Sequence, residues 1–216
     1  MTVGGSSTDG IRTAGISAIV LDIEGTTTPI SFVTETLFPY ARARLEAFLA
    51  REERGGEAAG FLAEMDRDSK SPALKELQGR IWIDGYASGD LVGAVFDDVP
   101  RAFAVWHADG RRIGIYSSGS VLAQQCLFRY SSAGDLTRFI AAYFDTAVGP
   151  KQDPASYTRI AGAAGADPGS ILFVSDVVRE LDAARTAGMR TVLSQRPGNP
   201  PQPAHSHRII QTFDEI

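Results

Sequence analysis

The chain has 216 residues, 44% of them hydrophobic, and its 21 basic and 26 acidic residues give a net charge of −5. A chain of this length buries roughly 70% of its unfolded surface, so it needs no disulfide or structural metal, and its length favours one domain or one domain with an insertion. The acidic balance argues against a nucleic-acid surface, the single Cys126 excludes an intrachain disulfide framework and a Cys-rich zinc site, and no apolar run reaches the ~18 residues of a membrane span.

The first residues, 1–15, are small and polar and offer little apolar surface to bury. We expect a flexible leader there, and its lack of an apolar segment does not fit a secretory signal. A cytoplasmic protein without a membrane partner is the resulting expectation.

The first buried strand is predicted over 16–21, an apolar run that ends at Asp22. Apolar residues then recur with helical spacing over 31–54, where Pro39 marks a kink or a boundary between two helices. Further helices are expected near 57–67 and 72–83, with Gly85 and Gly89 in the turns that follow. The absence of strand-like runs predicts a helical insertion over about 30–98.

After Pro100 the pattern alternates between helices and short apolar strands. Helices are expected at 102–108, 120–128, 154–164 and 177–187, and strands at 112–116, 139–144, 171–174 and 191–193. The proline-rich segment 197–203 reads as a loop. Alternation of this kind predicts an α/β protein, a Rossmann-like doubly wound parallel sheet built from 16–29 and 99–216, with an inserted α-helical segment.

Polar residues follow directly after the predicted strands. They are Asp22 and Glu24, then Ser117 and Ser118, then Lys151, then Asp176 with Glu180 one helical turn later. Ligands of open parallel sheets bind at the carboxyl ends of the strands, so we expect these side chains to meet in one crevice.

These residue types suit phosphoryl transfer. Asp22 and Asp176 are the carboxylates that Mg²⁺ takes alongside water and a substrate phosphate. Asp22 can attack phosphorus, and Glu24, two residues on, can protonate the leaving oxygen and later activate water. Hydroxyl groups and a lysine then bind and neutralise the phosphate oxygens.

The order of the acidic stretch, the serine, the lysine and the second acid resembles the haloacid dehalogenase superfamily of aspartate-nucleophile phosphatases. The stretches DIEGTTTPISFVTETLFPYAR, LQGRIWIDGYASGDL, IYSSGSVLAQQCLF, YFDTAVGPKQDPASY and ILFVSDVVRELDAAR are similar to its enolase-phosphatase family over about 17–195. Glu24, where most of the superfamily carries aspartate, is typical of that family. The resemblance implies a haloacid dehalogenase-like core that acts in methionine salvage. It would enolise 2,3-diketo-5-methylthiopentyl-1-phosphate and then remove its phosphate, leaving the acireductone.

The resemblance also implies a role for each site residue. Asp22 matches the nucleophile and a metal ligand, Glu24 the acid/base with its carbonyl on the metal, and Asp176 the remaining ligand. Ser117, Ser118 and Lys151 match the substrate-phosphate contacts, and Glu180 fits a supporting acid that holds Lys151 or a metal-bound water. One Mg²⁺ per subunit, a small phosphoester substrate, a helical cap over the site and a monomer are implied as well.

Each of these residues also has a simpler interpretation when taken alone. Asp22 or Asp176 could cap a helix, Lys151 could be solvated, and Glu180 could be an ordinary helix-surface acid. Only the joint arrangement favours catalysis. A generic phosphatase of the same superfamily and a phospho-acceptor receiver domain are the alternatives, and the receiver is disfavoured because it has no such helical insertion.

Several other residues are not assigned to the site. The histidines His107, His205 and His207 lack partner spacing for a metal, and Cys126 is expected to be a small core residue. Trp82 and Tyr86 could line a pocket, but packing in the helical segment is the favoured interpretation. Neither Glu24 nor Lys151 is preferred as the base for enolisation.

Overall fold

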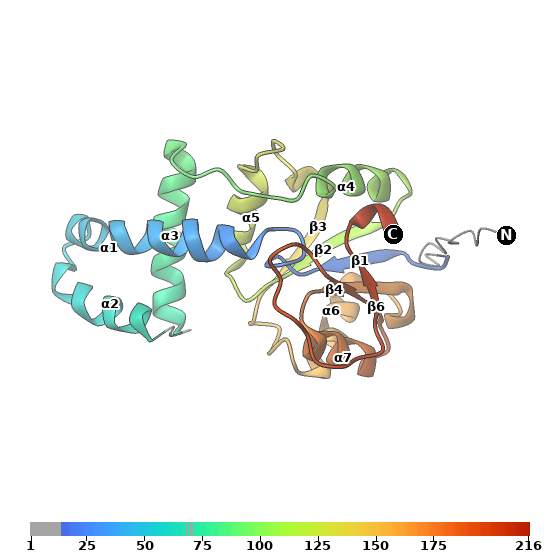
Figure 1. Cartoon of the computed structure of the whole chain (residues 1–216). Coiled ribbons are helices and arrows are strands. Elements are labelled where there is room, and N and C mark those ends of the chain that lie inside the picture. Colours follow the sequence, from blue (N-terminus) through green and yellow to red (C-terminus); the bar gives the residue numbers. More distant parts are fainter. Residues whose placement is uncertain (1–13, 68, 70) are drawn as a thin grey trace, which may run out of the picture.

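The computed structural model of the chain describes residues 14–67, 69 and 71–216, so most of the expected leader, 1–15, lies outside the described residues. Its centre is a parallel six-stranded sheet in the order β3-β2-β1-β4-β5-β6 (Figure 1). The strands are β1 (Ala18–Leu21), β2 (Arg112–Tyr116), β3 (Ile140–Phe144), β4 (Ile171–Ser175), β5 (Arg190–Ser194) and β6 (Arg208–Ile210). The predicted doubly wound parallel sheet is therefore confirmed.

Side chains of the central strands alternate between two apolar layers. Ile19 and Leu21 of β1 belong to one buried cluster, and Ala18 and Val20 belong to the other. The helices α4 (Val99–Ala108) and α5 (Val121–Arg129) contribute to the first cluster, and α6 (Pro154–Ala164) and α7 (Val178–Thr186) contribute to the second. Burial on both faces explains why these strands read as continuous apolar runs. Cys126 packs in the first cluster, as expected.

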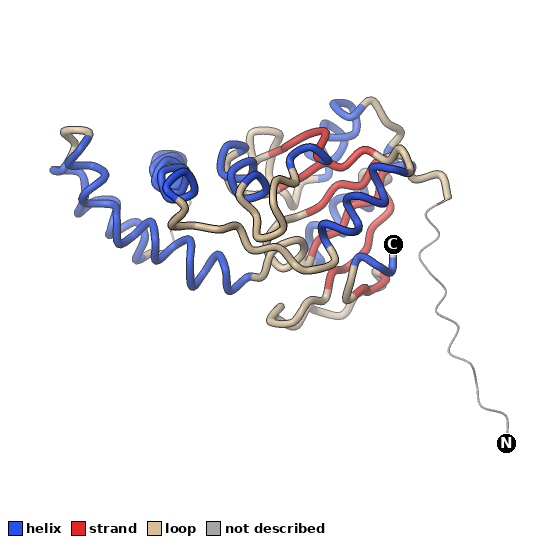
Figure 2. The backbone as a smooth tube through the Cα atoms, turned by 90° about the horizontal axis from the view of Figure 1, so that it is seen from above, coloured by secondary structure: helices blue, strands red, loops and turns tan. Residues whose placement is uncertain are grey.

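The segment between β1 and α4 is helical and extends to one side of the sheet (Figure 2). It contains a π-helical turn (Phe32–Leu37), α1 (Phe38–Arg51), α2 (Ala58–Asp66) and α3 (Pro72–Ser88). Pro39 lies in the first turn of α1, at the predicted boundary between two helices. The Trp82 indole N–H donates to the Leu37 carbonyl over 2.8 Å, which joins α3 to this boundary. In the described ranges, no helix combines the length and apolar character of a bilayer crossing.

One turn was placed wrongly from the sequence. Gly85 lies inside α3, and the helix ends instead at Gly89, whose φ of +82° is the left-handed conformation that glycine favours. The reason is packing: a Cβ at Gly85 would lie 2.6 Å from the Tyr40 ring of α1. The glycine therefore serves the close approach of two helices rather than a turn.

A buried arginine joins the two chain segments that connect the helical segment to the sheet. The Arg196 guanidinium bonds to the Asp98 carboxylate at 2.8 Å and donates to the Thr26 carbonyl at 3.3 Å. The rings of Phe96 and Phe213 each lie 4.6 Å from it. In addition, the Phe96 N–H donates to the Thr27 carbonyl over 3.0 Å. Both connections are thus held at a fixed position beside the carboxyl end of β1.

We predict opposite effects of alanine at two glycines. A Cβ at buried Gly93 would lie 2.2 Å from the Leu127 carbonyl oxygen, a backbone atom, so Gly93→Ala should lower the free energy of unfolding by about 2 kcal/mol. Gly60, inside α2, has open space around its Cα, so Gly60→Ala should raise it by roughly 0.5–1 kcal/mol. Urea unfolding of both variants measures this, and an unchanged Gly93→Ala protein would contradict the described packing.

Candidate active site

Asp22 is the first residue after the central strand β1. Its backbone N–H donates to the Val174 carbonyl at 3.0 Å and extends the β1–β4 ladder by one bond. The carboxylate is buried, and its Oδ1 accepts the Ile23 N–H at 2.7 Å. The chain order reverses between β1 and β4, so Asp22 lies at the switch point where ligands of such sheets bind.

Lys151 connects Asp22 to Glu180. Its Nζ lies 2.7 Å from Asp22 Oδ1 and 2.7 Å from Glu180 Oε2, and all three side chains are nearly buried. Burial alone would lower the pKa of Lys151, but the charges and hydrogen bonds of the two acids outweigh it and raise the pKa. The side chain is therefore held as an ammonium. Of the two roles expected for Glu180, the structure shows the contact with Lys151.

Two buried tyrosines fix the loop that carries this lysine. The Tyr157 hydroxyl donates to the Lys151 carbonyl at 2.7 Å, and the Tyr116 hydroxyl donates to the Gly149 carbonyl at 2.9 Å. The loop follows β3, the edge strand, so these contacts bring the ammonium inward toward β1.

Ser175 belongs to the same network and was missed by the sequence analysis. Its Oγ lies 3.2 Å from Asp22 Oδ2 and 3.0 Å from Glu180 Oε2, and it accepts the Val177 N–H at 3.1 Å. The sequence feature that could have identified Ser175 is its position as the last residue of β4, next to the end of β1. A single hydroxyl hydrogen serves one of the two carboxylates at a time.

Asp176 faces the loop that follows Asp22. A Cβ at Gly25 would lie 2.4 Å from Asp176 Oδ2, and Gly25 has a φ of +67°, so only glycine fits this position. Burial, and secondly the charge of Asp22, raise the pKa of Asp176 to about 7. The two strand-end acids therefore repel each other across the switch point, as carboxylates do when no cation joins them.

These acids fit a divalent cation. Within the described ranges, no group of three or more His, Cys, Asp and Glu side chains is arranged to hold a metal. Mg²⁺ needs fewer, since it binds one or two carboxylates together with water and phosphate oxygens. Such an ion, bound beside Asp22 and Asp176, would relieve the repulsion between the two carboxylates. Gly25 has no side chain that would cover the Asp176 carboxylate.

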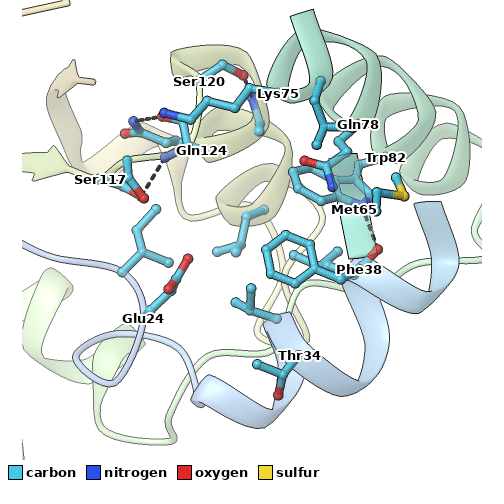
Figure 3. Close-up of a pocket in the computed structure, with 18 of the residues that line it drawn as sticks. Glu24, Thr34, Phe38, Met65, Lys75, Gln78, Trp82, Ser117, Ser120 and Gln124 are labelled. Carbon is cyan, nitrogen blue, oxygen red and sulfur yellow. Dashed lines mark hydrogen bonds between the residues drawn. The ribbon is translucent and has the colours of Figure 1, made fainter. Parts of the chain in front are cut away.

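The loop after β2 carries the predicted serines. Ser117 is buried, and its Oγ accepts the Gly119 N–H at 3.2 Å, while Ser120 caps α5 by accepting the Ala123 N–H at 3.3 Å. Ser117 and Ser118 both line a cavity of about 630 Å³, and Glu24 lies on its wall (Figure 3). The structure thus places the serines and Glu24 on one cavity, and it brings Asp22, Lys151 and Glu180 into direct contact.

The far wall of this cavity comes from the helical segment. Its side chains are mostly apolar, among them Phe38, Met65 and Leu74, and Trp82 and Tyr86 belong to them too. These last two residues also pack in the core cluster, so the expectation that they only pack is wrong. Sequence periodicity does not separate a core position from a cavity wall, because both are apolar and inward-facing.

The histidines are engaged by other groups. The His107 ring contacts the Phe139 ring edge-on. Both ring nitrogens of His207 have partners, Thr191 Oγ1 at 2.8 Å and Asp182 Oδ1 at 3.0 Å, and the His205 ring stacks on the His207 ring.

We predict that Lys151→Met destabilises the protein in a pH-dependent way when metal is chelated. Without the ammonium, Asp22 and Glu180 repel each other, so the free energy of unfolding should fall by about 3 kcal/mol. Burial raises the pKa of Glu180 from 4.5 to about 7, and loss of the cation raises it further. A raised carboxyl pKa gives stability that is present below the unfolded value and is lost as the pH rises through the folded value.

The loss in the free energy of unfolding caused by Lys151→Met should therefore be largest above pH 7 and should become smaller toward pH 4.5. Urea unfolding across this range measures it, with Arg101→Met as the control because the ion pair of Arg101 with Asp214 is exposed. An equal deficit at every pH would contradict the ion network.

Known proteins match the chain over almost its full length. The model of the haloacid dehalogenase-like hydrolases matches residues 16–188. A protein named enolase-phosphatase E1 from Synechococcus elongatus is 46% identical over 93% of this chain and 98% of its own length. A grapevine protein, named a probable bifunctional methylthioribulose-1-phosphate dehydratase/enolase-phosphatase E1, is 42% identical over the whole chain and 49% of its own length.

Solved structures agree with these relatives. The UTR4 protein of Saccharomyces cerevisiae has a TM-score of 0.82 and 36% identity, covering 93% of this chain and all of the yeast chain. The chain therefore belongs to the haloacid dehalogenase-like hydrolases and, among them, to the enolase-phosphatase E1 family.

Proposed function

We propose that the chain converts 2,3-diketo-5-methylthiopentyl-1-phosphate into 1,2-dihydroxy-3-keto-5-methylthiopentene, the acireductone, and phosphate. The observation that supports this proposal is the Asp22–Lys151–Glu180 network at the strand ends. Ile23 and Glu24, which follow Asp22 in the chain, line a cavity of about 630 Å³ whose far wall is apolar. Such a cavity suits a phosphate at the strand ends and a methylthio tail against Trp82 and Phe38.

The name of the grapevine relative supports this substrate. It joins the enolase-phosphatase to a dehydratase of methylthioribulose-1-phosphate. Loss of one water from that ketopentose phosphate gives a vicinal diketone that keeps both the phosphate and the methylthio group. The dehydratase product is then the compound that this family would receive, which places the chain in methionine salvage.

The phosphatase step uses residues of the sheet. Asp22 attacks phosphorus, and the bond between phosphorus and the leaving oxygen breaks as an aspartyl-phosphate forms. Ser117, Ser118 and Lys151 hold the phosphate oxygens, and the ammonium of Lys151 offsets the charge that develops on them. Glu24 gives a proton to the leaving oxygen and then takes one from the water that hydrolyses the aspartyl-phosphate.

Glu24 is also the better candidate for the base of the enolisation step. Asp22 and Glu180 keep Lys151 protonated, which removes it as a base, whereas Glu24 lies on the cavity wall. A proton taken from C1 by Glu24 is then the one that it returns to the leaving oxygen. One carboxyl group thus serves both halves of the reaction.

We propose one Mg²⁺ per subunit, held by the carboxylates of Asp22 and Asp176 and the backbone carbonyl of Glu24. When bound, the ion would neutralise charge between the nucleophile and the phosphate dianion. The helical segment, about 30–98, is proposed as the cap that excludes water from the cavity. We also propose that the protein is a cytoplasmic monomer and that it has no nucleic-acid partner.

The first test is phosphate release from the diketone phosphate by purified protein with Mg²⁺. Asp22→Asn should reduce release to background, because an amide does not form the acyl-phosphate. Asp109→Asn, the same substitution at an exposed position, should release phosphate like the wild type. Substantial hydrolysis by Asp22→Asn would refute the nucleophile, and wild-type preference for an unrelated sugar phosphate would favour the generic phosphatase.

The metal assignment predicts a different behaviour for Asp176→Asn. The Mg²⁺ concentration for half-maximal rate should rise by at least the roughly 10- to 100-fold typical of losing an outer-shell partner. The variant should still fold, since removing an acid with a raised pKa relieves repulsion in the metal-free protein. A Mg²⁺ titration and a thermal melt measure the two effects. Unfolding with an unchanged Mg²⁺ requirement would contradict the assignment.

A further inference from the structure

Two polar side chains of α3, those of Lys75 and Gln78, lie on the wall of the cavity. Lys75 is half-buried and Gln78 is 9% exposed, and both line the cavity. Among the residues that the structure describes, neither side chain forms an ion pair or a hydrogen bond. Their ammonium and amide groups are therefore free to donate hydrogen bonds to a ligand in the cavity.

The path of α3 shows which part of the cavity these two residues border. A Cβ at Gly79 would lie 3.4 Å from Ser120 Oγ at the start of α5, and the Tyr86 and Tyr130 rings stack at 5.8 Å near its end. The two helices thus run side by side in the same direction. Lys75 precedes Gly79 by one turn on the same face, so it lies toward the serine loop and the strand ends.

Figure 3 shows Lys75 and Gln78 on α3, opposite Glu24 across the cavity. Trp82, one turn beyond Gln78, begins the apolar part. The wall therefore changes along α3 from an ammonium through an amide to aromatic rings. A substrate with a phosphate at one end, polar oxygens in the middle and an apolar tail matches this order.

We propose that Lys75 and Gln78 bind the two keto oxygens of the substrate, with Lys75 on the C2 oxygen and Gln78 on the C3 oxygen. The proposal rests on the proposed function and extends it, because it names the groups that recognise the diketone. Lys75 takes the C2 oxygen since C2 is the carbonyl nearer the phosphate and Lys75 is the residue nearer the strand ends. Both side chains supply the N–H donors that carbonyl oxygens accept.

Enolisation gives Lys75 a catalytic role as well. The C1–H bond breaks and its proton passes to Glu24, its electron pair forms the C1–C2 double bond, and the carbonyl pair moves to the C2 oxygen. The negative charge develops on the oxygen that faces the ammonium, so Lys75 binds the transition state more strongly than the ground state. The C3 oxygen gains less charge, and Gln78 contributes mainly to substrate binding.

The test compares two substrates in the full-length protein with Mg²⁺. The diketone phosphate requires carbonyl recognition, whereas para-nitrophenyl phosphate has no carbonyl group. Lys75→Met should lower kcat on the diketone phosphate by about 10²-fold, and Gln78→Met should raise KM about tenfold. Both variants should hydrolyse para-nitrophenyl phosphate like the wild type, and Lys75→Arg should recover part of the lost kcat.

Glu76→Gln is the matched control, because it changes the charge of the same helix by one unit at an exposed position. It should leave both activities unchanged. Lys75→Gln replaces the methionine variant if that protein does not fold.

The outcomes separate this inference from the proposed function. A wild-type protein that does not turn over the diketone phosphate refutes the proposed function itself. If the wild type turns it over and Lys75→Met retains its kcat, the inference is wrong. Equal losses on both substrates would also overturn it, since Lys75 would then act on the phosphate or on the fold rather than on a carbonyl.

Discussion

The ammonium of Lys151 is the contact on which the site depends. It lies 2.7 Å from a carboxylate oxygen of Asp22 and 2.7 Å from one of Glu180, in surroundings that exclude most water. Two buried acids that share one cation would repel each other if that cation were removed. The lysine therefore offsets the charge of both acids, and in the proposed function it would also supply positive charge to an incoming phosphate.

The sheet topology makes this contact possible. Asp22, Lys151 and Glu180 follow β1, β3 and β4, which are far apart in the chain, and parallel pairing directs all three strand ends to one edge. The loops then complete the approach, Gly25 by leaving room for Asp176 and Tyr157 by holding the Lys151 carbonyl. The helical segment adds what the sheet lacks, which is an apolar cavity wall opposite Glu24 and the serine loop.

The sequence predicted the parts of this arrangement that depend on strand ends. Five of the strands and the residues after them were predictable because buried parallel strands are continuous apolar runs. The three-residue β6 has no such signal. Ser175 was missed because a hydroxyl inside an apolar strand resembles a packing residue, and Gly85 was misplaced because the approach of Tyr40 is a tertiary contact. The cavity, too, depends on how α3 packs against α5, which periodicity alone does not specify.

The two reactions assigned to the site have one carbon in common, and this explains why one cavity serves both. Enolisation removes a proton from C1, and dephosphorylation breaks the O–P bond of the oxygen that C1 carries. In the proposed binding mode, a substrate with its phosphate at Lys151 would keep C1 near Glu24 in both steps, so that no repositioning is needed between them. Under the proposed function the two parts of the protein have different tasks: the sheet binds the phosphate, and the α3 wall contacts the carbonyl groups and the tail of the substrate. Under the same proposal, selectivity for a diketone would reside in the inserted helices, where residues can change without disturbing the ion network at the strand ends.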